Sequence, residues 1–304
     1  MTVFDRRLLR HRRDRAARHA GDVPFLFPET AERLAERLED MARGFPHALD
    51  LGCREGALAS VLRGRGGIEF LVSSDLSPAM AWHAAGTGRP ALAADEEALP
   101  FAERAFDLVF SSLSLHWVND LPGALLQIRR CLRPDGLFLG AMLGGATLGE
   151  LRAVLMQAEL DIEGGASPRI SPFVDIRDAG NLLQRAGFAL PVADADTLTV
   201  SYPDALTLMR DLRRLGESNV LHERRRTPTR RETLMRAAAL YAERFGRTDG
   251  SVPATFQIVY LTAWAPHPDQ QRPLAPGSAR GRLADALDSP EIPAGDAADP
   301  KPRR

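Results

Sequence analysis

The sequence predicts an α/β protein with a mostly parallel, seven-stranded sheet, an antiparallel last strand and a helical lid or insert. Three observations support this fold class. Short apolar runs alternate with helix-compatible segments between residues 47 and 143, and a glycine turn over residues 52–56 joins the first run to a helix. The run over residues 105–112 is almost continuously apolar, which is typical of strands buried on both faces of a parallel sheet. Strands that alternate with helices in this way form parallel sheets covered by helices.

The length and composition are those of an ordinary globular protein. The chain has 304 residues, of which 44% are hydrophobic and 26% are charged. Its 39 basic and 40 acidic residues leave a formal net charge of -1, which argues against a general electrostatic binder of nucleic acid. Two cysteines, Cys53 and Cys131, are too few for a disulfide framework or a cysteine zinc site. No apolar run reaches the roughly 18 residues of a membrane-spanning helix and the first residues lack a signal-peptide core, so we expect a cytoplasmic protein that is not integral to a membrane.

The chain divides into three predicted parts. Residues 1–27 are an arginine-rich arm that is compatible with a helix, and we expect a solvated helix there, with a docking surface for an acidic partner as the alternative. Arginine-rich openings also occur in mitochondrial transit peptides, but Asp5 and Asp14 argue against one because transit peptides contain few acids. The main domain covers residues 28–265. Residues 266–304 contain few large apolar side chains, so we expect a disordered, Pro-rich tail.

The first half of the main domain is predicted from periodicity and helix caps. Apolar side chains at helical spacing indicate an amphipathic helix over residues 28–41. The first strand and the glycine turn lead into a helix at Ala57, and the second strand ends at Asp75. Ser77 is the expected N-cap of the next helix, with Pro78 at its first position. The other elements expected before residue 144 are strands over 91–94, 105–112 and 137–143, a helix over 121–132 and a turn over 133–136.

Beyond Gly144 the simple alternation ends. The expected helices cover residues 147–162, 175–186, 203–215 and 229–246, and the expected strands cover residues 192–200 and 255–264. We expect the last two strands to pair in antiparallel fashion. Residues 147–187 and 202–250 are the expected lid and insert regions.

The glycine turn is a candidate ligand loop. Gly52 and Gly56 have no side chains, so the backbone can adopt conformations that other residues rarely adopt. A ligand can also approach the main chain closely at these positions. The turn follows a strand and precedes a helix, which is where open α/β sheets bind ligands. Asp75 follows Gly56 at about the 20-residue spacing at which a carboxylate meets ribose hydroxyls. Two strand ends therefore converge on one predicted ligand.

The glycine turn also carries a family resemblance. Asp50 lies two residues before Gly52, and this pattern resembles motif I of class I S-adenosylmethionine (SAM) methyltransferases, which have a Rossmann-like fold. The chain departs from the family at Arg54, where members usually carry a further glycine. Asp95, together with residues 99–101 and 106–107, resembles the segment whose acid meets the adenine amino group. The resemblance implies SAM as the cofactor and the following cofactor-binding residues: Asp50, Gly52, Cys53, Gly56, Asp75, Leu76, Asp95, Glu96 and Ser112.

Candidates for chemistry on the substrate are fewer. His116 and Trp117 follow the fourth strand, where this fold usually presents residues to the transferred group. His116 could act as a general base, and a purely structural histidine is the alternative. An iron site of the kind that oxidases use needs a cluster such as two histidines and a carboxylate. Only His267-Pro268-Asp269 has suggestive spacing, and it lies at the start of the tail, so we expect no metal site.

Further segments carry a more specific resemblance: residues 144–152, 163–173, 216–219 and 250–260. Together with Phe4-Asp5-Arg6, they resemble the mitochondrial complex I assembly factor of methyltransferase fold that acts as an arginine hydroxylase. The resemblance extends from residue 3 to residue 265 and implies that this chain is a bacterial homologue. It also implies a partner, the complex I subunit that holds the terminal iron-sulfur cluster, and a peripheral position at the inner membrane during assembly.

Three functions stay open at this point. An arginine substrate is a cation, so an acid such as Glu150, Glu163 or Glu217 could pair with its guanidinium, and Glu217 is the candidate for this role. Hydroxylation also needs an oxidant and electrons, for which the sequence shows no source. The alternatives are SAM-dependent methyl transfer to a small-molecule, carrier-bound or protein acceptor, and a non-catalytic complex I assembly chaperone that keeps the SAM site.

Overall fold

The computed structural model describes residues 2–19, 25–62, 64–86, 88–270, 278 and 281–290. The chain forms two compact units, Met1–His267 and Pro268–Arg304. The second unit contains one short described helix, α10 (Leu283–Ala286), which buries no residue, and most of the predicted disordered tail lies outside the described residues. Within the described parts, no helix is both long and apolar enough to cross a membrane.

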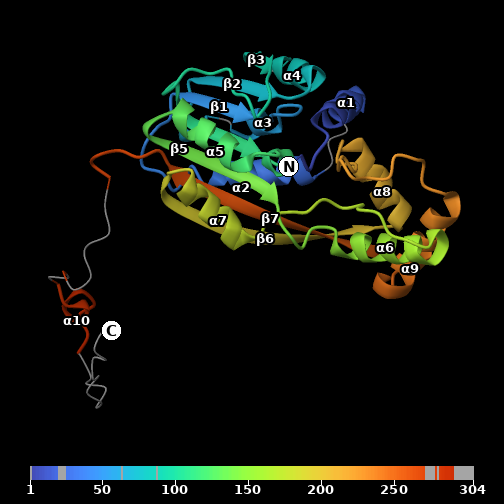
Figure 1. The fold of residues 1–304 in the computed structure, drawn as a ribbon. Helices are drawn as coiled ribbons and strands as arrows, with labels where there is room; N and C mark the ends of the chain where they lie inside the picture. The colour runs from blue at the N-terminus through green and yellow to red at the C-terminus, as the bar shows by residue number, and fades with distance from the viewer. Residues whose placement is uncertain are drawn as a thin grey trace, which may run out of the picture. The chain divides into compact units, whose positions relative to one another are not determined.

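A seven-stranded sheet organises the first unit (Figure 1). Its strand order is β3-β2-β1-β4-β5-β7-β6, and β1 to β5 are mutually parallel. β7 runs antiparallel to both β5 and β6, which confirms the predicted sheet and its antiparallel last strand. The strands are β1 (His47–Leu51), β2 (Phe70–Asp75), β3 (Ala91–Ala93), β4 (Phe106–Ser112), β5 (Leu132–Leu143), β6 (Ala189–Tyr202) and β7 (Val252–Trp264).

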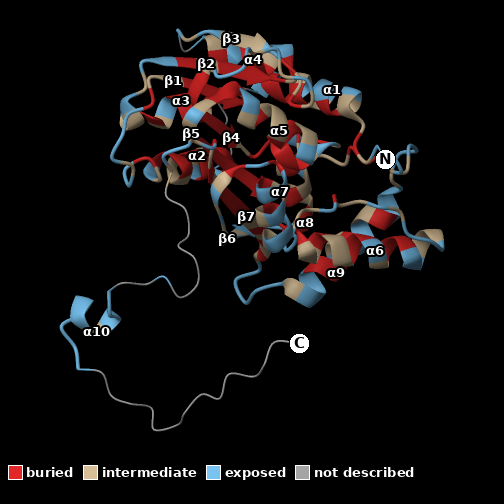
Figure 2. Cartoon of the chain, turned by 60° about the vertical axis from the view of Figure 1, so that its left-hand side comes forward, coloured by how far each residue is buried: buried red, intermediate tan, exposed pale blue. Residues whose placement is uncertain are grey.

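Helices cover both faces of this sheet. One apolar core lies beneath α2 and α3, and a second lies beneath α5 and α7 (Figure 2). α6, α8 and α9 gather at one end of the long strands β6 and β7, where α6 packs against α9 (Figure 1). The helices are α1 (Arg6–Ala16), α2 (Leu26–Glu36), α3 (Ala57–Leu62), α4 (Pro78–Ala85), α5 (Leu121–Cys131), α6 (Gly149–Glu163), α7 (Ile176–Arg185), α8 (Ala205–Arg214) and α9 (Arg231–Phe245).

Most predicted elements are present, with local corrections. Ser77 caps α4 as expected, because its Oγ accepts a hydrogen bond from the Met80 N–H at 3.1 Å. α2 begins two residues before the predicted helix and ends at Glu36, after which residues 37–40 form turns. The predicted turn over 133–136 lies inside β5, because Leu132 and Leu137 both pair with β4 and the residues between them bulge out.

The arm before residue 28 differs from the predicted solvated helix. α1 is helical and Asp5 caps it, but Leu9, Arg13 and Ala16 on one of its faces are buried. The helix packs beside α4, and the neighbouring strand segment at Phe4 bridges to Leu221. The N-terminal arm is therefore part of the folded domain and reaches the carboxyl ends of the parallel strands.

Candidate functional site

The glycine turn after β1 has the conformation that a ligand loop needs. Gly52 and Gly56 have φ values of 76° and 85°, in the left-handed region that favours glycine. The N–H groups of Gly52 and Cys53 donate to the Ser74 carbonyl at 2.8 and 2.9 Å, which draws the turn against the end of β2. A Cβ atom at Gly52 would overlap the side chain of Ser114, so glycine is required there.

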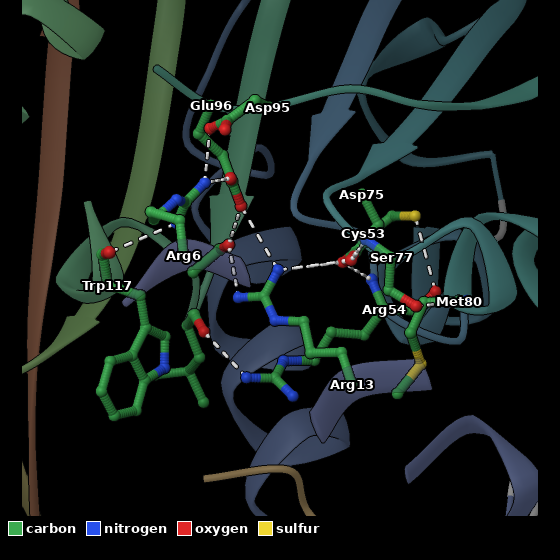
Figure 3. A network of polar contacts seen from close by, with 12 residues as sticks. Arg6, Arg13, Cys53, Arg54, Asp75, Ser77, Met80, Asp95, Glu96 and Trp117 are labelled. Carbon is green, nitrogen blue, oxygen red and sulfur yellow. Dashed lines mark hydrogen bonds and ion pairs between the residues drawn. The ribbon is translucent and has the colours of Figure 1, made fainter. Parts of the chain in front are cut away.

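Acidic side chains lie at or near the ends of three neighbouring strands, and Figure 3 shows those at the end of β2 and after β3. Asp75 at the end of β2 is fully buried and accepts hydrogen bonds from the main-chain N–H groups of Ser77 at 2.8 Å and Arg54 at 3.0 Å. Asp95 and Glu96 follow β3, where Glu96 is buried and Asp95 is partly exposed. The structure thus brings together the acids that the sequence assigned to one cofactor.

Asp50 in β1 is a buried acid without a hydrogen-bond partner among the described residues. Burial, together with the nearby negative charge of Asp75, raises the pKa of Asp50 to about 7. Its carboxyl group is therefore largely protonated below neutral pH and becomes an uncompensated buried charge above it.

Asp50→Asn should stabilise the protein increasingly as the pH rises from 5 to 8. The folded pKa of about 7 lies above the usual value of 3.8, so the wild-type protein loses stability as the pH rises towards 7 and the neutral amide does not. The shift of roughly 3 pKa units corresponds to about 4 kcal/mol at pH 8, of which about 3 kcal/mol arises between pH 5 and pH 8. Urea unfolding at pH 5 and pH 8 measures the difference. A constant difference between the variants would show that Asp50 does not titrate in this window.

Two arginines of α1 bind these strand-end acids (Figure 3). Nη1 of Arg13 lies 3.3 Å from both carboxylate oxygens of Asp75 and 3.3 Å from Oε1 of Glu96. Its Nη2 donates to Oγ of Ser114 at 3.0 Å, and the Arg13 side chain is fully buried. Arg6 donates to Asp95 at 2.6 Å and also to Glu96.

These contacts determine the charge state of Glu96. Burial alone would raise its pKa, but the positive charges of Arg6 and Arg13 and a hydrogen bond from Ser114 lower the pKa to about 2. Glu96 is therefore ionised at neutral pH although it is buried. Five charged side chains form one network across the end of the sheet: Arg6, Arg13, Asp75, Asp95 and Glu96.

The sequence patterns did not single out Arg13 or Ser114 as functional. A signal was present, because Arg6, Leu9, Arg13 and Ala16 follow one another at helical spacing and so share a face of α1. Arginines on an otherwise apolar helix face indicate that they meet acids in the interior. The excess of arginine in this segment instead suggested a solvated surface.

A second buried cluster lies on the other side of the glycine turn. Nη2 of Arg54 pairs with Glu217, and Nη1 donates to the Leu215 carbonyl at 2.9 Å. The guanidinium also lies 4.1 Å from the centre of the Phe27 ring, at cation–π distance. Glu217 accepts a further hydrogen bond from the Trp117 indole N–H at 2.8 Å. Burial alone would raise the pKa of Glu217, but Arg54 and His116 lower it to about 2.

His116 lies beside this cluster with both ring nitrogens facing the protein. Its Nδ1 accepts from the Leu143 N–H at 3.5 Å, which assigns the proton of the neutral ring to Nε2. Nε2 lies 3.5 Å from Oε2 of Glu217, and burial lowers the pKa of His116. The lone pair that a general base needs is thus turned towards the backbone of β5 in this conformation.

The remaining predicted site residues lie around the same edge of the sheet. Cys53 is buried in the glycine turn, where burial raises the pKa of its thiol, and Leu76 is half-buried directly after Asp75. Ser112 is the last residue of β4, and its hydroxyl has no hydrogen-bond partner in the described part of the chain. The described residues contain no group of three or more His, Cys, Asp or Glu side chains placed to hold a metal ion.

A cavity of about 600 Å³ lies next to this edge. Its walls come from the N-terminal segment at Val3, from Arg152 of α6, from residues 168–173 and from Glu223. Ile170, Ser171 and Phe173 also line a second cavity of about 30 Å³, which reaches Glu217 and Trp117. The segment that contains Phe173 therefore separates an outer cavity from the Arg54–Glu217 cluster.

Comparisons with known proteins agree with this arrangement. A family model described as a methyltransferase domain matches residues 49–140. The crystal structure of the YcgJ protein from Bacillus subtilis superposes with a TM-score of 0.54 at 13% identity, covering 77% of this chain and 98% of that one. Malonyl-[acyl-carrier protein] O-methyltransferase from Methylovorus sp. is 35% identical over 87% of this chain and 90% of its own length. The fold and the strand-end site thus define a protein of the class I methyltransferase type.

A second relative is more similar. The mitochondrial arginine-hydroxylase NDUFAF5 of Danio rerio is 47% identical over 289 residues, which cover 94% of this chain and 89% of the relative. The chain belongs to the arginine-hydroxylase NDUFAF5 family.

Proposed function

We propose that this protein binds SAM at the carboxyl ends of β1, β2, β3 and β4 and hydroxylates an arginine of a protein substrate. The observation that supports this most strongly is the 47% identity to an arginine-hydroxylase over 94% of the chain. That similarity includes the segments around the outer cavity, well outside the glycine turn. The proposed partner is the complex I iron-sulfur subunit that the sequence resemblance implies, and the proposed location is the cytoplasm, at the inner membrane during assembly.

The residues at the strand ends fit SAM. Gly52 and Gly56 give the turn its left-handed conformation, and the unpaired oxygens of Asp50 and Ser112 offer hydrogen-bond acceptors. Asp75 is the residue that would accept from the ribose hydroxyls, and Asp95 from the adenine amine. When bound, SAM supplies an electrophilic methyl group on a sulfonium. In the methyltransferase alternative this methyl group is transferred to the acceptor. In the hydroxylase alternative SAM serves a different role.

The cavity of about 600 Å³ is the proposed acceptor site. It is bounded by the loop at Phe173, whose ring centre lies 5.9 Å from that of His116. Glu223 lines it with a carboxylate that has no ion pair in the described part of the chain, so it can attract a cationic side chain. Glu217 stays a candidate for guanidinium recognition deeper inside, but Arg54 already occupies its carboxylate. A substrate arginine would have to share Glu217 with Arg54.

Mass spectrometry of the iron-sulfur subunit tests the proposal. Cells with and without the gene are compared, and the arginine-bearing peptides are sequenced. We expect the mass of one oxygen atom on an arginine only when the gene is present. The mass of one methylene group would instead establish methyl transfer, and an unmodified subunit that copurifies with the protein would establish the assembly chaperone.

Asp75→Asn should weaken SAM binding by about ten- to a hundredfold. Asparagine keeps the shape of the side chain but removes the charge, and hydrogen bonds to charged acceptors contribute about 1.5 to 3 kcal/mol. Titration calorimetry measures the affinity. Asp178→Asn, at an exposed position of α7, is the matched control and should bind SAM as the wild type does. Equal affinities for the Asp75 and Asp178 variants would remove Asp75 from the cofactor site.

A further inference from the structure

An acidic groove runs between α2 and the edge of the sheet. It has a volume of about 700 Å³ and shares no lining residue with the outer cavity or the cofactor-site network. Six of its residues are acids and two are arginines, so carboxylates are in clear excess. The lining residues are Glu29, Glu32, Arg33, Glu36, Arg37, Asp40, Asp194, Asp196 and Tyr260.

The acids of the groove differ in how they are neutralised. Arg33 pairs with Glu29 at 2.8 Å and with Asp196, and Arg37 pairs with Asp194 at 2.6 Å. Arg65, outside the groove lining, pairs with Glu32 at 2.6 Å. Glu36 and Asp40 have no ion pair within the described ranges of the chain. Their charges are therefore available to an external cation.

Tyr260 of β7 provides a second, independent observation. It is only 1% exposed and lines the groove, and its hydroxyl has no hydrogen-bond partner among the described residues. A buried hydroxyl without a partner is unfavourable and uncommon in folded proteins. Burial raises the pKa of Tyr260, so the hydroxyl is neutral and can both donate and accept. The Arg37 guanidinium lies 4.6 Å from the centre of the Tyr260 ring, which shows that cations approach this side chain.

The spacing of the acids favours an extended ligand over a single ion. Glu29, Glu32 and Glu36 recur once per turn of α2 and form a row roughly 10 Å long. This is the length of about three residues of extended chain. The network at α1 shows the matching chemistry in the same protein, because Arg6 and Arg13 are each held by two carboxylates.

We propose that this groove docks a basic segment of a partner protein, with Glu36 and Asp40 pairing its arginine or lysine side chains and the Tyr260 hydroxyl bonding to it. The groove thus holds the partner at a surface separate from the acceptor cavity. Its role does not depend on the reaction that the protein catalyses.

Fluorescence anisotropy with a labelled hexa-arginine peptide tests the groove. Glu36→Gln combined with Asp40→Asn should weaken peptide binding about tenfold at low salt, since each exposed pair adds a modest energy. Glu232→Gln combined with Glu243→Gln, at exposed positions of α9, removes the same charge elsewhere and should leave binding unchanged. Equal weakening in both double variants would mean a general charge effect and overturn the proposal.

Tyr260→Phe separates docking from folding. If the hydroxyl serves the ligand, the variant should bind the peptide about threefold more weakly while its melting temperature stays the same or rises. Unchanged peptide affinity, or a lower melting temperature, would instead assign the hydroxyl to the fold and overturn its place in the proposal. SAM affinity, measured on the same variants, should equal that of the wild type.

Discussion

Arg13→Met should bind SAM about tenfold more tightly than the wild-type protein. The Arg13 guanidinium contacts both oxygens of Asp75, the carboxylate that would accept from the cofactor ribose, and also contacts Glu96 and Ser114. If Asp75 binds the cofactor as proposed, SAM and Arg13 compete for the same acceptors, and Arg13 has to release Asp75 when the cofactor binds. Methionine removes the competing donors while keeping an unbranched side chain. A tenfold change in affinity corresponds to about 1.4 kcal/mol, which calorimetry resolves readily.

The same substitution should lower the stability of the protein without SAM. Removing one partner of a buried ion pair leaves the other charge uncompensated, which typically costs about 3 to 5 kcal/mol. Thermal melts should show this loss, and SAM should restore more stability to Arg13→Met than to the wild type. Arg10→Met, at an exposed position of α1, is the matched control. Weaker SAM binding by Arg13→Met than by this control would mean that Arg13 contacts the cofactor and does not compete with it.

The burial of α1 illustrates what the sequence could and could not predict. The alternation of apolar runs and helices predicted the parallel sheet, because that pattern depends on local periodicity. The strand-end positions of Asp50, Asp75 and Asp95 followed from the same local reading. Arg13 was missed because its burial depends on acids more than 60 residues away, Asp75 among them at a separation of 62 residues. An arginine-rich segment is solvated unless such partners exist, and composition alone does not reveal them.

Arg54 is a second residue whose surroundings could not be predicted from the sequence. The methyltransferase pattern made it a departure from the usual glycine, and the structure gives the reason why an arginine can replace it. Its φ of 49° is in the left-handed region, which is strained for a residue with a side chain. The side chain offsets this strain through Glu217, which lies 163 residues further along the chain, and through the Phe27 ring. No local pattern connects these residues.

Glu217→Gln should destabilise the protein by about 3 kcal/mol and also weaken SAM binding. The substitution leaves the buried guanidinium of Arg54 without its charged partner, which is the costly way to break a buried pair. Arg54 also donates its main-chain N–H to Asp75, so movement of this residue disturbs the cofactor site. The sequence assigned Glu217 to the guanidinium of the substrate. The contact with Arg54 predicts instead that both properties change together.

A double-mutant cycle separates these two roles of Glu217. Arg54→Gly restores the glycine usual in the methyltransferase pattern, and combined with Glu217→Gln it removes both charges at once. We expect the double variant to be more stable than Glu217→Gln alone, with a coupling energy of about 1 to 3 kcal/mol, and to regain SAM affinity. Urea unfolding measures the stability and calorimetry measures the SAM affinity.

The modification of the substrate distinguishes the roles of Glu217. If the double variant binds SAM but leaves the substrate arginine unmodified, Glu217 also serves the substrate. If modification returns, Glu217 acts only by holding Arg54. Additive effects on stability would show that the Arg54–Glu217 pair does not couple the glycine turn to the rest of the site.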